Sequence, residues 1–323
     1  MTLIDVHSHF VPEHFPSAPP EERRWPCMCH HSAGRADVMI AGKNFRSVDA
    51  RSWAATRRID DMARAGVTCQ VLSPMPELLS YWFAAEHALD FSRYINEQIA
   101  TVVAQHPQHF RGMGMVPLQD PEMAAGLLAE IKSAGLSAVE VGSNVNGRYL
   151  GDPLFDEFLK EAQRLDLALF VHALHPIGAE RLQAYAELVP FAAFPLDTAL
   201  CAMTLIRAGV PERMPDLRVG FSHGGGAVIP LAHRMDKGAQ VTAQFQGELS
   251  RPPSAYAREF FFDSLVYDVG YLRYLCEFAP GQVFCGTDYP YLIMDGEPQT
   301  VIVGAGDTPD LRYGAAQKFL RLD

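Results

Sequence analysis

Short apolar runs alternate with longer segments of helical periodicity along most of this 323-residue chain. Strands that alternate with helices form βαβ units, which place their strands in one parallel sheet. The predicted strands are Leu3–His7, Thr68–Ser73, Gly112–Pro117, Ala138–Gly142, Ala168–His172, Leu217–His223, Phe260–Ser264 and Val283–Asp288. The predicted helices include Ala54–Ala65, Ala84–Gln105, Glu122–Ala134, Pro153–Leu165 and Leu200–Ala208. Eight such units match a closed (β/α)8 barrel of the TIM type.

A doubly wound sheet is the alternative arrangement, but no Gly-x-Gly-x-x-Gly follows the first strand. We therefore predict an α/β chain that forms one distorted (β/α)8 TIM barrel domain over residues 1–323. Residues 11–48 are rich in Pro, Gly, Arg and His and lack helical periodicity. We expect them to form a small insertion over the barrel mouth, built on a hairpin around Asp37–Ile40. The C-terminal stretch Leu311–Leu322 has the pattern of an amphipathic helix that closes the structure.

The charge balance argues against several classes of partner. The chain has 27 Lys and Arg against 38 Asp and Glu, a formal net charge of −11, and it has no basic run. Such a chain is a poor candidate for binding nucleic acid or an anionic membrane. No apolar stretch approaches the length of a spanning helix, and the N-terminus lacks the pattern of a signal peptide. We expect a soluble, cytoplasmic protein.

The six cysteines are too few and too dispersed to form a disulfide framework. The segment Cys27-Met28-Cys29-His30-His31 is the one cluster that suggests zinc. A structural zinc site usually needs a second, distant pair of ligands, and none is evident in the sequence. We interpret this segment as a surface loop.

Histidine and aspartate side chains stand at the carboxyl ends of several predicted strands. His7 and His9 lie two residues apart, so on a strand both imidazoles would point to the same face. His172, His223 and Asp288 end the predicted fifth, sixth and eighth strands. Active sites of (β/α)8 barrels form at this end of the strands. Imidazole and carboxylate groups that converge there predict a transition-metal site.

Each of these residues also has an ordinary structural interpretation. His7 and His9 could lie in an N-terminal loop, and His172 could be a hydrogen-bonded core histidine. His223 could cap the following helix, and Asp288 could be an N-cap before a turn. Without a metal site, all of these separate structural explanations would have to be true at the same end of different strands. We therefore favour the metal site.

These motifs together identify a resemblance to the amidohydrolase superfamily, and more narrowly to the branch that contains aminocarboxymuconate semialdehyde decarboxylase. The matching segments, spread over nearly the whole chain, are Ile4–Phe10, Gly42–Arg46, Val171-His172, Ser222–Gly226, Arg251–Ser254, Phe262–Ser264 and Gly286–Pro290.

The resemblance implies one divalent metal ion held by four residues, His7, His9, His172 and Asp288. Zinc is the expected ion, and manganese and iron also accept this ligand set. His223 would be the acid/base beside a metal-activated water. Many binuclear members of the superfamily have a carboxylated lysine on the fourth strand, whereas here that strand has Glu140 and no lysine. We expect a mononuclear site and interpret Glu140 as a polar supporting group rather than a ligand of a second metal.

The resemblance also implies substrate-binding residues. Arg46 would hold a substrate carboxylate through its planar guanidinium, although an exposed arginine is its ordinary alternative. Arg234 would reach the active site of a neighbouring subunit in a homodimer, or else lie on a solvated helix face. After the fifth-strand histidine the branch continues with Pro-Trp and an acidic residue, whereas this chain has Ala173-Leu174-His175. His175 is therefore either a new substrate contact or an ordinary loop histidine.

We predict a metal-dependent, non-oxidative decarboxylase that acts on a small unsaturated or aromatic carboxylic acid. A hydrolase or hydratase acting on a C–N, C–O or C=C bond is the alternative, because the same activated water and acid/base would serve it. A non-catalytic metal-binding protein is the third and least favoured interpretation, because the acid/base residue His223 is present.

Overall fold

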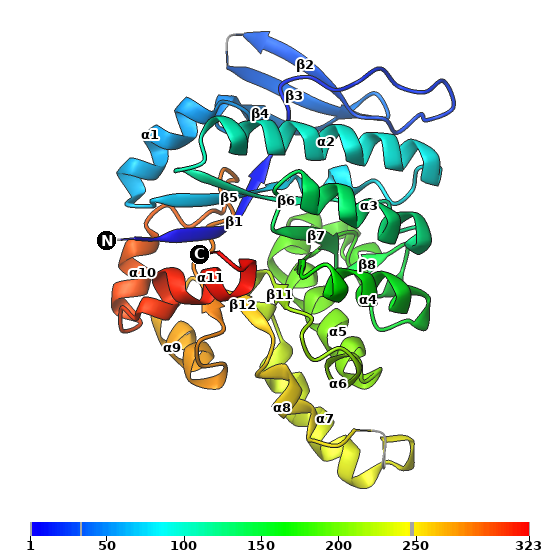
Figure 1. Cartoon of the computed structure of the whole chain (residues 1–323), viewed down its shortest axis with the longest axis vertical. Helices are drawn as coiled ribbons and strands as arrows, with labels where there is room; N and C mark the ends of the chain where they lie inside the picture. Colours follow the sequence, from blue (N-terminus) through cyan, green and yellow to red (C-terminus); the bar gives the residue numbers. More distant parts are fainter. Residues whose placement is uncertain (1, 33, 246–248, 323) are drawn as a thin grey trace.

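The computed structural model describes residues 2–32, 34–245 and 249–322. Its main sheet has eight parallel strands in the order β1-β5-β6-β7-β10-β11-β12-β13, and Figure 1 shows them surrounded by helices. The strands are β1 (Ile4–Phe10), β5 (Cys69–Pro74), β6 (Phe110–Gly114), β7 (Ala138–Gly142), β10 (Ala168–His172), β11 (Val219–Phe221), β12 (Phe261–Asp263) and β13 (Val283–Phe284). Parallel bridges from Asp5 to Cys285 and from Ser8 to Tyr289 join the last strand segment to the first. The predicted (β/α)8 barrel is confirmed.

Helices cover the outside of the barrel between successive strands. They are α1 (Ala55–Ala65), α2 (Ala85–Gln105), α3 (Pro121–Ser133), α4 (Asp156–Arg164), α5 (Phe194–Arg207), α6 (Val210–Arg213), α7 (Val228–Val241), α8 (Pro253–Ala257), α9 (Val269–Phe278), α10 (Pro298–Gly304) and α11 (Ala315–Leu320). Local sequence sets several of their ends. Asp120 caps α3 by accepting from the backbone N–H of Met123, and Asp268 caps α9 in the same way through Tyr271.

The C-terminal helix closes one end of the barrel. Phe319 of α11 packs against Phe261 and Phe284, with ring centroids 5.1 Å from each. These rings belong to a buried apolar cluster that includes Ile4 and Val6 from β1. The interior near the beginning of the strands is therefore filled by side chains, and polar groups gather at the opposite end.

Several predicted strands end earlier than expected, and two of them carry candidate site residues. The segments predicted at 217–223 and 283–288 continue only through β11 and β13. His223 and Asp288 have φ angles of 57° and 61°, in the left-handed region. A residue in this conformation cannot continue a strand ladder, so both side chains project from turns beyond the strand ends.

The segment between β1 and α1 forms a three-stranded antiparallel sheet, rather than the single hairpin predicted around Asp37–Ile40. Its strands are β2 (Cys27–Ser32), β3 (Arg35–Ile40) and β4 (Lys43–Asp49). A turn through Ala41 and Gly42, both with positive φ, joins β3 to β4. Cys27 and Cys29 are exposed on the edge strand β2, so the surface loop predicted for them is a surface strand.

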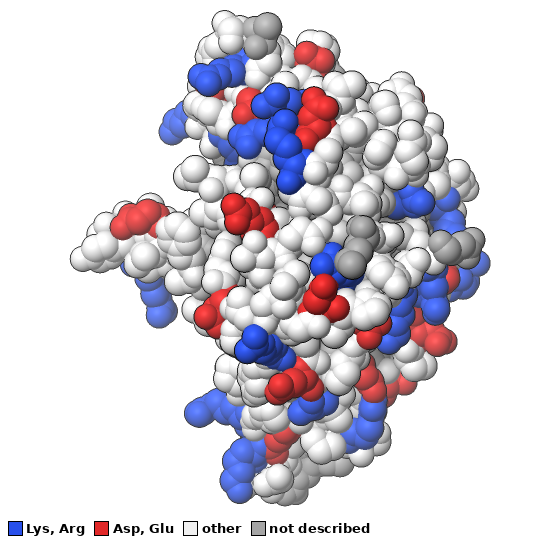
Figure 2. All heavy atoms as spheres, turned by 90° about the vertical axis from the view of Figure 1, so that its left-hand side faces the viewer, with Lys and Arg blue, Asp and Glu red and all other residues white. Residues whose placement is uncertain are grey.

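The prediction that no segment approaches the length of a spanning helix was wrong. Residues Gln183–Arg207 form a helical stretch of 25 residues that is long and apolar enough to cross a membrane by length and composition alone. Half of its most apolar 18 residues are buried inside the protein. Its C-terminal part is α5, whose buried residues include Cys201, Leu205 and Ile206. We interpret it as a helical segment that packs on the barrel core. On the face shown in Figure 2, basic and acidic side chains are interspersed.

Candidate metal centre and substrate pocket

Four buried side chains meet at the carboxyl end of the barrel strands. His7 and His9 come from β1, His172 is the last residue of β10, and Asp288 follows β13. One potential ligand atom from each lies within 4.8 Å of those of the other three. His7 Nε2 lies 3.1 Å from His9 Nε2, and Asp288 Oδ1 lies 3.4 Å and 3.1 Å from these two nitrogens. The structure thus brings together all four predicted ligands.

Hydrogen bonds on the far side of each imidazole determine which nitrogen faces the centre. His9 Nδ1 lies 3.1 Å from the carbonyl oxygen of Pro74, and His172 Nδ1 lies 2.9 Å from that of Ala173. His7 Nδ1 lies 2.7 Å from Asp263 Oδ2. Carbonyl and carboxylate oxygens only accept, so each Nδ1 carries the hydrogen. Each Nε2 can then offer its lone pair to a metal.

The donor set fits a single divalent ion. Ligands that lie 2.0–2.1 Å from a tetrahedral centre are about 3.3 Å apart, close to the separations among His7, His9 and Asp288. His172 Nε2 and Asp288 Oδ1 are buried and have no hydrogen-bond partner among the described residues. Leaving buried polar atoms unpaired is costly, and an ion between them would satisfy both.

The protonation states also suit metal binding. Burial lowers the pKa of His9 to about 4 and that of His172 well below its usual value, so both rings are neutral. Burial alone would raise the pKa of Asp288, but the adjacent His7 and His9 rings lower it well below the usual range. Burial opposes the cation of His7, yet Asp263 and Asp288 outweigh burial and raise its pKa to about 10. A metal ion would therefore displace a proton from His7.

His223 lies beside this group and is not part of it. Its ring centroid is 5.1 Å from that of His172 and 5.5 Å from that of His7. Its Nδ1 lies 3.0 Å from Ser222 Oγ. Burial lowers the pKa of His223, so the ring is a neutral base at neutral pH. The following glycines are needed for this turn, because a Cβ on Gly226 would lie 2.0 Å from the carbonyl oxygen of Pro195.

Asp263 on β12 links the metal ligands to His223. Its Oδ2 accepts from His7 Nδ1 and, at 2.8 Å, from the backbone N–H of His223, while Oδ1 accepts from Gly224 N at 2.7 Å. Burial opposes its ionised form, but these contacts hold its pKa below the usual value. The sequence predicted that Asp263 lies in a segment shared with the family, Phe262–Ser264, but it predicted no role for this residue. Its place at the carboxyl end of a predicted strand was the available signal.

A cavity of about 920 Å³ opens above the metal ligands. Its lining residues include the following: Phe45, Arg46, Met75, Pro76, Glu77, His172, Leu174, His175, Val189, Phe191, Phe194, His223, Asp288, Tyr291 and Ile293. Mostly apolar walls with a few convergent polar groups are typical of a small-molecule site.

The three predicted substrate-binding residues lie in different surroundings, and two of them line the cavity. The Arg46 guanidinium lies over the ring of Tyr291, 4.1 Å from its centroid, and Tyr291 stacks on His9. No carboxylate lies within ion-pair distance of Arg46 among the described residues. His175 lines the cavity, whereas Arg234 is exposed on α7 and does not line it. Tyr291, which connects Arg46 to a metal ligand, was missed because the sequence gives no sign of this stacking.

Known proteins of similar sequence are decarboxylases. The chain is 33% identical to 2-amino-3-carboxymuconate-6-semialdehyde decarboxylase of Dictyostelium discoideum, over 99% of this chain and 92% of that protein. It is 29% identical to a gamma-resorcylate decarboxylase of Rhodococcus jostii, over 64% of this chain and 68% of that protein.

Solved structures share the fold. The 5-carboxyvanillate decarboxylase of Sphingomonas paucimobilis superposes with a TM-score of 0.82 at 24% identity, over 100% of this chain and 99% of that one. A dihydroxybenzoic acid decarboxylase of a Polaromonas species, with bound manganese and the inhibitor 2-nitroresorcinol, has a TM-score of 0.79 at 20% identity, over 99% of this chain and 97% of that one. The model of the amidohydrolase family matches residues 4–321. The chain therefore belongs to the amidohydrolase family.

Proposed function

We propose that this protein is a metal-dependent, non-oxidative decarboxylase of a small unsaturated or aromatic carboxylic acid. The observation that carries the proposal is the group of four buried metal-ligand side chains with His223 beside it, at the base of a mostly apolar cavity. The full-length similarity to an aminocarboxymuconate semialdehyde decarboxylase supports the same reaction class.

The four residues His7, His9, His172 and Asp288 hold one divalent ion, with zinc as the first candidate. Manganese, present in the related Polaromonas structure, and iron are the alternatives. When bound, the ion supplies Lewis-acid polarisation of a substrate or water oxygen. Asp263 orients His7, and through the backbone N–H of His223 it also fixes the acid/base.

His223 moves the proton. Its ring is neutral, so it takes up a proton from solvent and later donates that proton to the substrate carbon that loses carbon dioxide. The departing carbon dioxide leaves its bonding electron pair on that carbon, and the returned proton takes up the pair. Since the reaction causes no net oxidation or reduction, it needs no oxidant and no redox-active flavin.

Arg46 and His175 bind the substrate in this proposal. Arg46 has no carboxylate partner among the described residues, so its guanidinium is available to pair with a substrate carboxylate. The apolar walls, which include Phe191 and Phe194, suit a planar conjugated acid.

In the same proposal the protein is a cytoplasmic homodimer. Arg234 of each subunit acts in the active site of the other subunit. A mixture of Arg234→Ala and His223→Ala chains then regains activity, because one of the two sites in each mixed dimer, or about a quarter of all sites after random subunit exchange, contains both residues. If two variants that are inactive alone stay inactive after subunit exchange, Arg234 does not act in this way.

The test is carbon dioxide release by metal-loaded protein from aminocarboxymuconate semialdehyde and from hydroxybenzoates. We expect release, and a loss of about 10²- to 10⁴-fold in His223→Ala with the metal content unchanged. The control is His31→Ala, which removes an exposed histidine on β2 and should leave the rate intact. A metal-loaded protein that releases no carbon dioxide but cleaves an ester or amide would contradict the proposal.

A further inference from the structure

We infer that Glu77 and His175 select substrates that carry a hydrogen-bond donor, such as a hydroxyl or amino group, on the part that points away from the metal. This inference rests on the proposed function, because it describes how the same cavity orients its carboxylic acid. It names the substrate class more narrowly, as acids with a donor at the far end rather than a methyl group or a second carboxylate.

Glu77 is a nearly buried acid in the wall of the substrate cavity. It lies in the 3₁₀ turn Pro76–Leu79, which follows β5, and only 9% of it is exposed. Its Oε2 lies 3.0 Å from His175 Nε2, and its Oε1 lies 3.6 Å from Arg24. Carboxylate oxygens only accept hydrogen bonds, and together they offer about four lone-pair sites. Glu77 therefore has acceptor capacity left for a substrate that enters the cavity.

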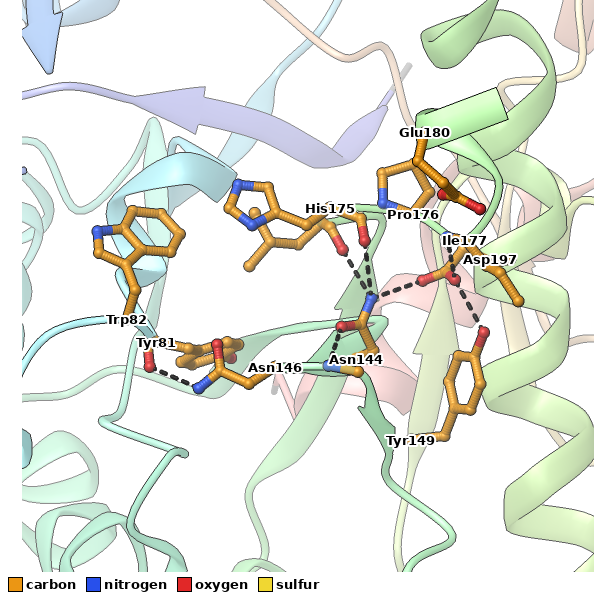
Figure 3. A pocket seen from close by; sticks show the side chains of 12 residues that line it. Tyr81, Trp82, Asn144, Asn146, Tyr149, His175, Pro176, Ile177, Glu180 and Asp197 are labelled. Carbon is orange, nitrogen blue, oxygen red and sulfur yellow. Dashed lines mark hydrogen bonds between the residues drawn. The ribbon is translucent and has the colours of Figure 1, made fainter. Parts of the chain in front are cut away.

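His175 is held rigidly against Glu77. Its ring stacks on Trp82, with centroids 4.9 Å apart and an interplanar angle of 18° (Figure 3). Its backbone φ of 43° lies in the left-handed region, which is strained for a residue with a side chain. A conformation of this kind persists only where neighbouring groups fix it.

The neighbouring pocket supplies that fixation. Asn144 Nδ2 donates to the carbonyl oxygens of Leu174 at 2.8 Å and His175 at 3.3 Å, and to Asp197 Oδ2 at 3.0 Å. Asp197 Oδ1 in turn accepts from the backbone N–H of Ile177 at 2.9 Å. Figure 3 shows this network on the loop that carries His175. The loop is therefore anchored on both sides of His175 before any substrate binds, as a selective contact requires.

The charges of the cavity walls favour a donor on this side. Glu180 and Glu187 line the cavity together with Glu77, so acidic side chains outnumber Arg24, the one cation paired with Glu77 among the described residues. Arg46 lies on β4, in the insertion sheet. A second carboxylate near Glu77 would meet like charge in a partly desolvated site. A hydroxyl or ammonium group there would find an anionic acceptor, which forms a stronger hydrogen bond than a neutral one.

The experiment uses matched substrates. One benzoic acid that the wild-type enzyme decarboxylates is compared with analogues that carry amino, hydroxyl, methyl or carboxylate at the position farthest from the reacting group. For the wild type we expect kcat/KM to be about tenfold or more higher with a donor than with methyl. The difference should lie mainly in KM, because the contact is remote from the reacting carbon.

Three variants test the residues. Glu77→Met, and His175→Phe, which keeps a ring on Trp82, should each reduce the donor-to-methyl ratio of kcat/KM by about tenfold, mainly by raising KM for the donor-bearing analogues. Glu77→Gln keeps one acceptor oxygen, but the amide is a weaker acceptor than a carboxylate, so this variant should retain only part of the preference for hydroxyl and amino analogues. The control Glu157→Gln alters an exposed acid on α4 and should leave every ratio unchanged.

The outcomes separate this inference from the proposed function. If the wild type decarboxylates the panel but prefers methyl or carboxylate analogues, or if Glu77→Met and His175→Phe both keep the wild-type ratio, the inference is overturned. A second panel carries a nitro group in place of the carboxylate that the enzyme removes, so its members bind but cannot react. Calorimetry of these nitro analogues with metal-loaded His223→Ala protein gives the same ratios without turnover. If no acid is decarboxylated yet donor-bearing nitro analogues bind about tenfold better, the reaction class is wrong and the selectivity stands.

Discussion

Asp263 shows how one side chain can serve two functional residues. Its carboxylate fixes the hydrogen on His7 Nδ1 and accepts from the backbone N–H groups of His223 and Gly224. Because it touches neither substrate nor metal in the proposed mechanism, it acts by positioning. A metal-ligating histidine is a better ligand when its other nitrogen donates to a carboxylate.

Replacing Asp263 by asparagine should therefore weaken metal binding. We expect the affinity for zinc to fall by about 10- to 100-fold, since an amide is a weaker acceptor for His7 and has one oxygen, whereas both carboxylate oxygens of Asp263 accept hydrogen bonds. Competition with a chelator of known affinity measures this change. The control is Asp216→Asn, at an exposed position, and an unchanged affinity in Asp263→Asn would argue against the positioning role.

Glu140 is a fully buried acid on β7 without a hydrogen-bond partner for either oxygen among the described residues. Burial raises its pKa to about 8 from an ordinary value of 4.5. The folded state thus holds this proton more tightly than the unfolded state does. The stability that it contributes is complete below pH 4.5 and is lost as the pH rises toward 8.

The variant Glu140→Gln, which has no proton to lose, should gain stability over the wild type as the pH rises. In metal-free protein we expect the difference in the free energy of unfolding to shift toward the variant by on the order of a few kcal/mol between pH 5 and pH 8. Urea unfolding of both proteins in the presence of a chelator measures it. A difference that does not change with pH would show that Glu140 is ionised in the folded state.

Helix α1 holds the ends of two strands through a buried arginine. Arg58, only 1% exposed, donates to Gln70 Oε1 at 2.6 Å and to the backbone carbonyl of His9. Its guanidinium also lies over the ring of Tyr289, 4.9 Å from the centroid, directly after Asp288. One side chain thus connects the segments that supply three of the four ligand residues.

Arg58→Met should lower the free energy of unfolding by about 1–3 kcal/mol, because the His9 carbonyl loses its side-chain donor inside the protein. Arg58→Lys should recover only part of this loss, since an ammonium group cannot reproduce the planar fork. Chemical denaturation measures both variants. The neighbouring Arg57 is exposed, so Arg57→Met is the matched control, and equal effects at the two positions would refute the role of Arg58.

The metal ion should stabilise the whole barrel, because its ligands come from β1, from the end of β10 and from the loop after β13. An ion present at about 1,000 times its Kd adds about 4 kcal/mol to the stability of the folded state. We expect a chelator to lower the melting temperature, and zinc or manganese to restore it. In His9→Ala the chelator should leave the melting temperature almost unchanged. If the chelator also leaves the melting temperature of the wild type unchanged, tight metal binding is excluded.

Much of the architecture was predictable from sequence because the relevant signals are local. The periodicities of apolar residues gave the eight barrel strands and most of the helices. The strand-end positions of His7, His9, His172 and Asp288 were enough to predict that they would meet, since a barrel places all its strand ends at one rim. The insertion was harder to predict, because its strands β2 and β4 are largely exposed and lack the alternation of a half-buried strand.

Sequence alone therefore determined the barrel and the residue types of the candidate metal centre. The tertiary structure decided how those residues are tuned: Asp263 against His7, Tyr291 between His9 and Arg46, and Glu77 against His175. The physical reason is that hydrogen bonds and stacking depend on distances of a few ångströms between segments far apart in the chain. Asp263 and His7 are 256 residues apart, and no local pattern records that contact.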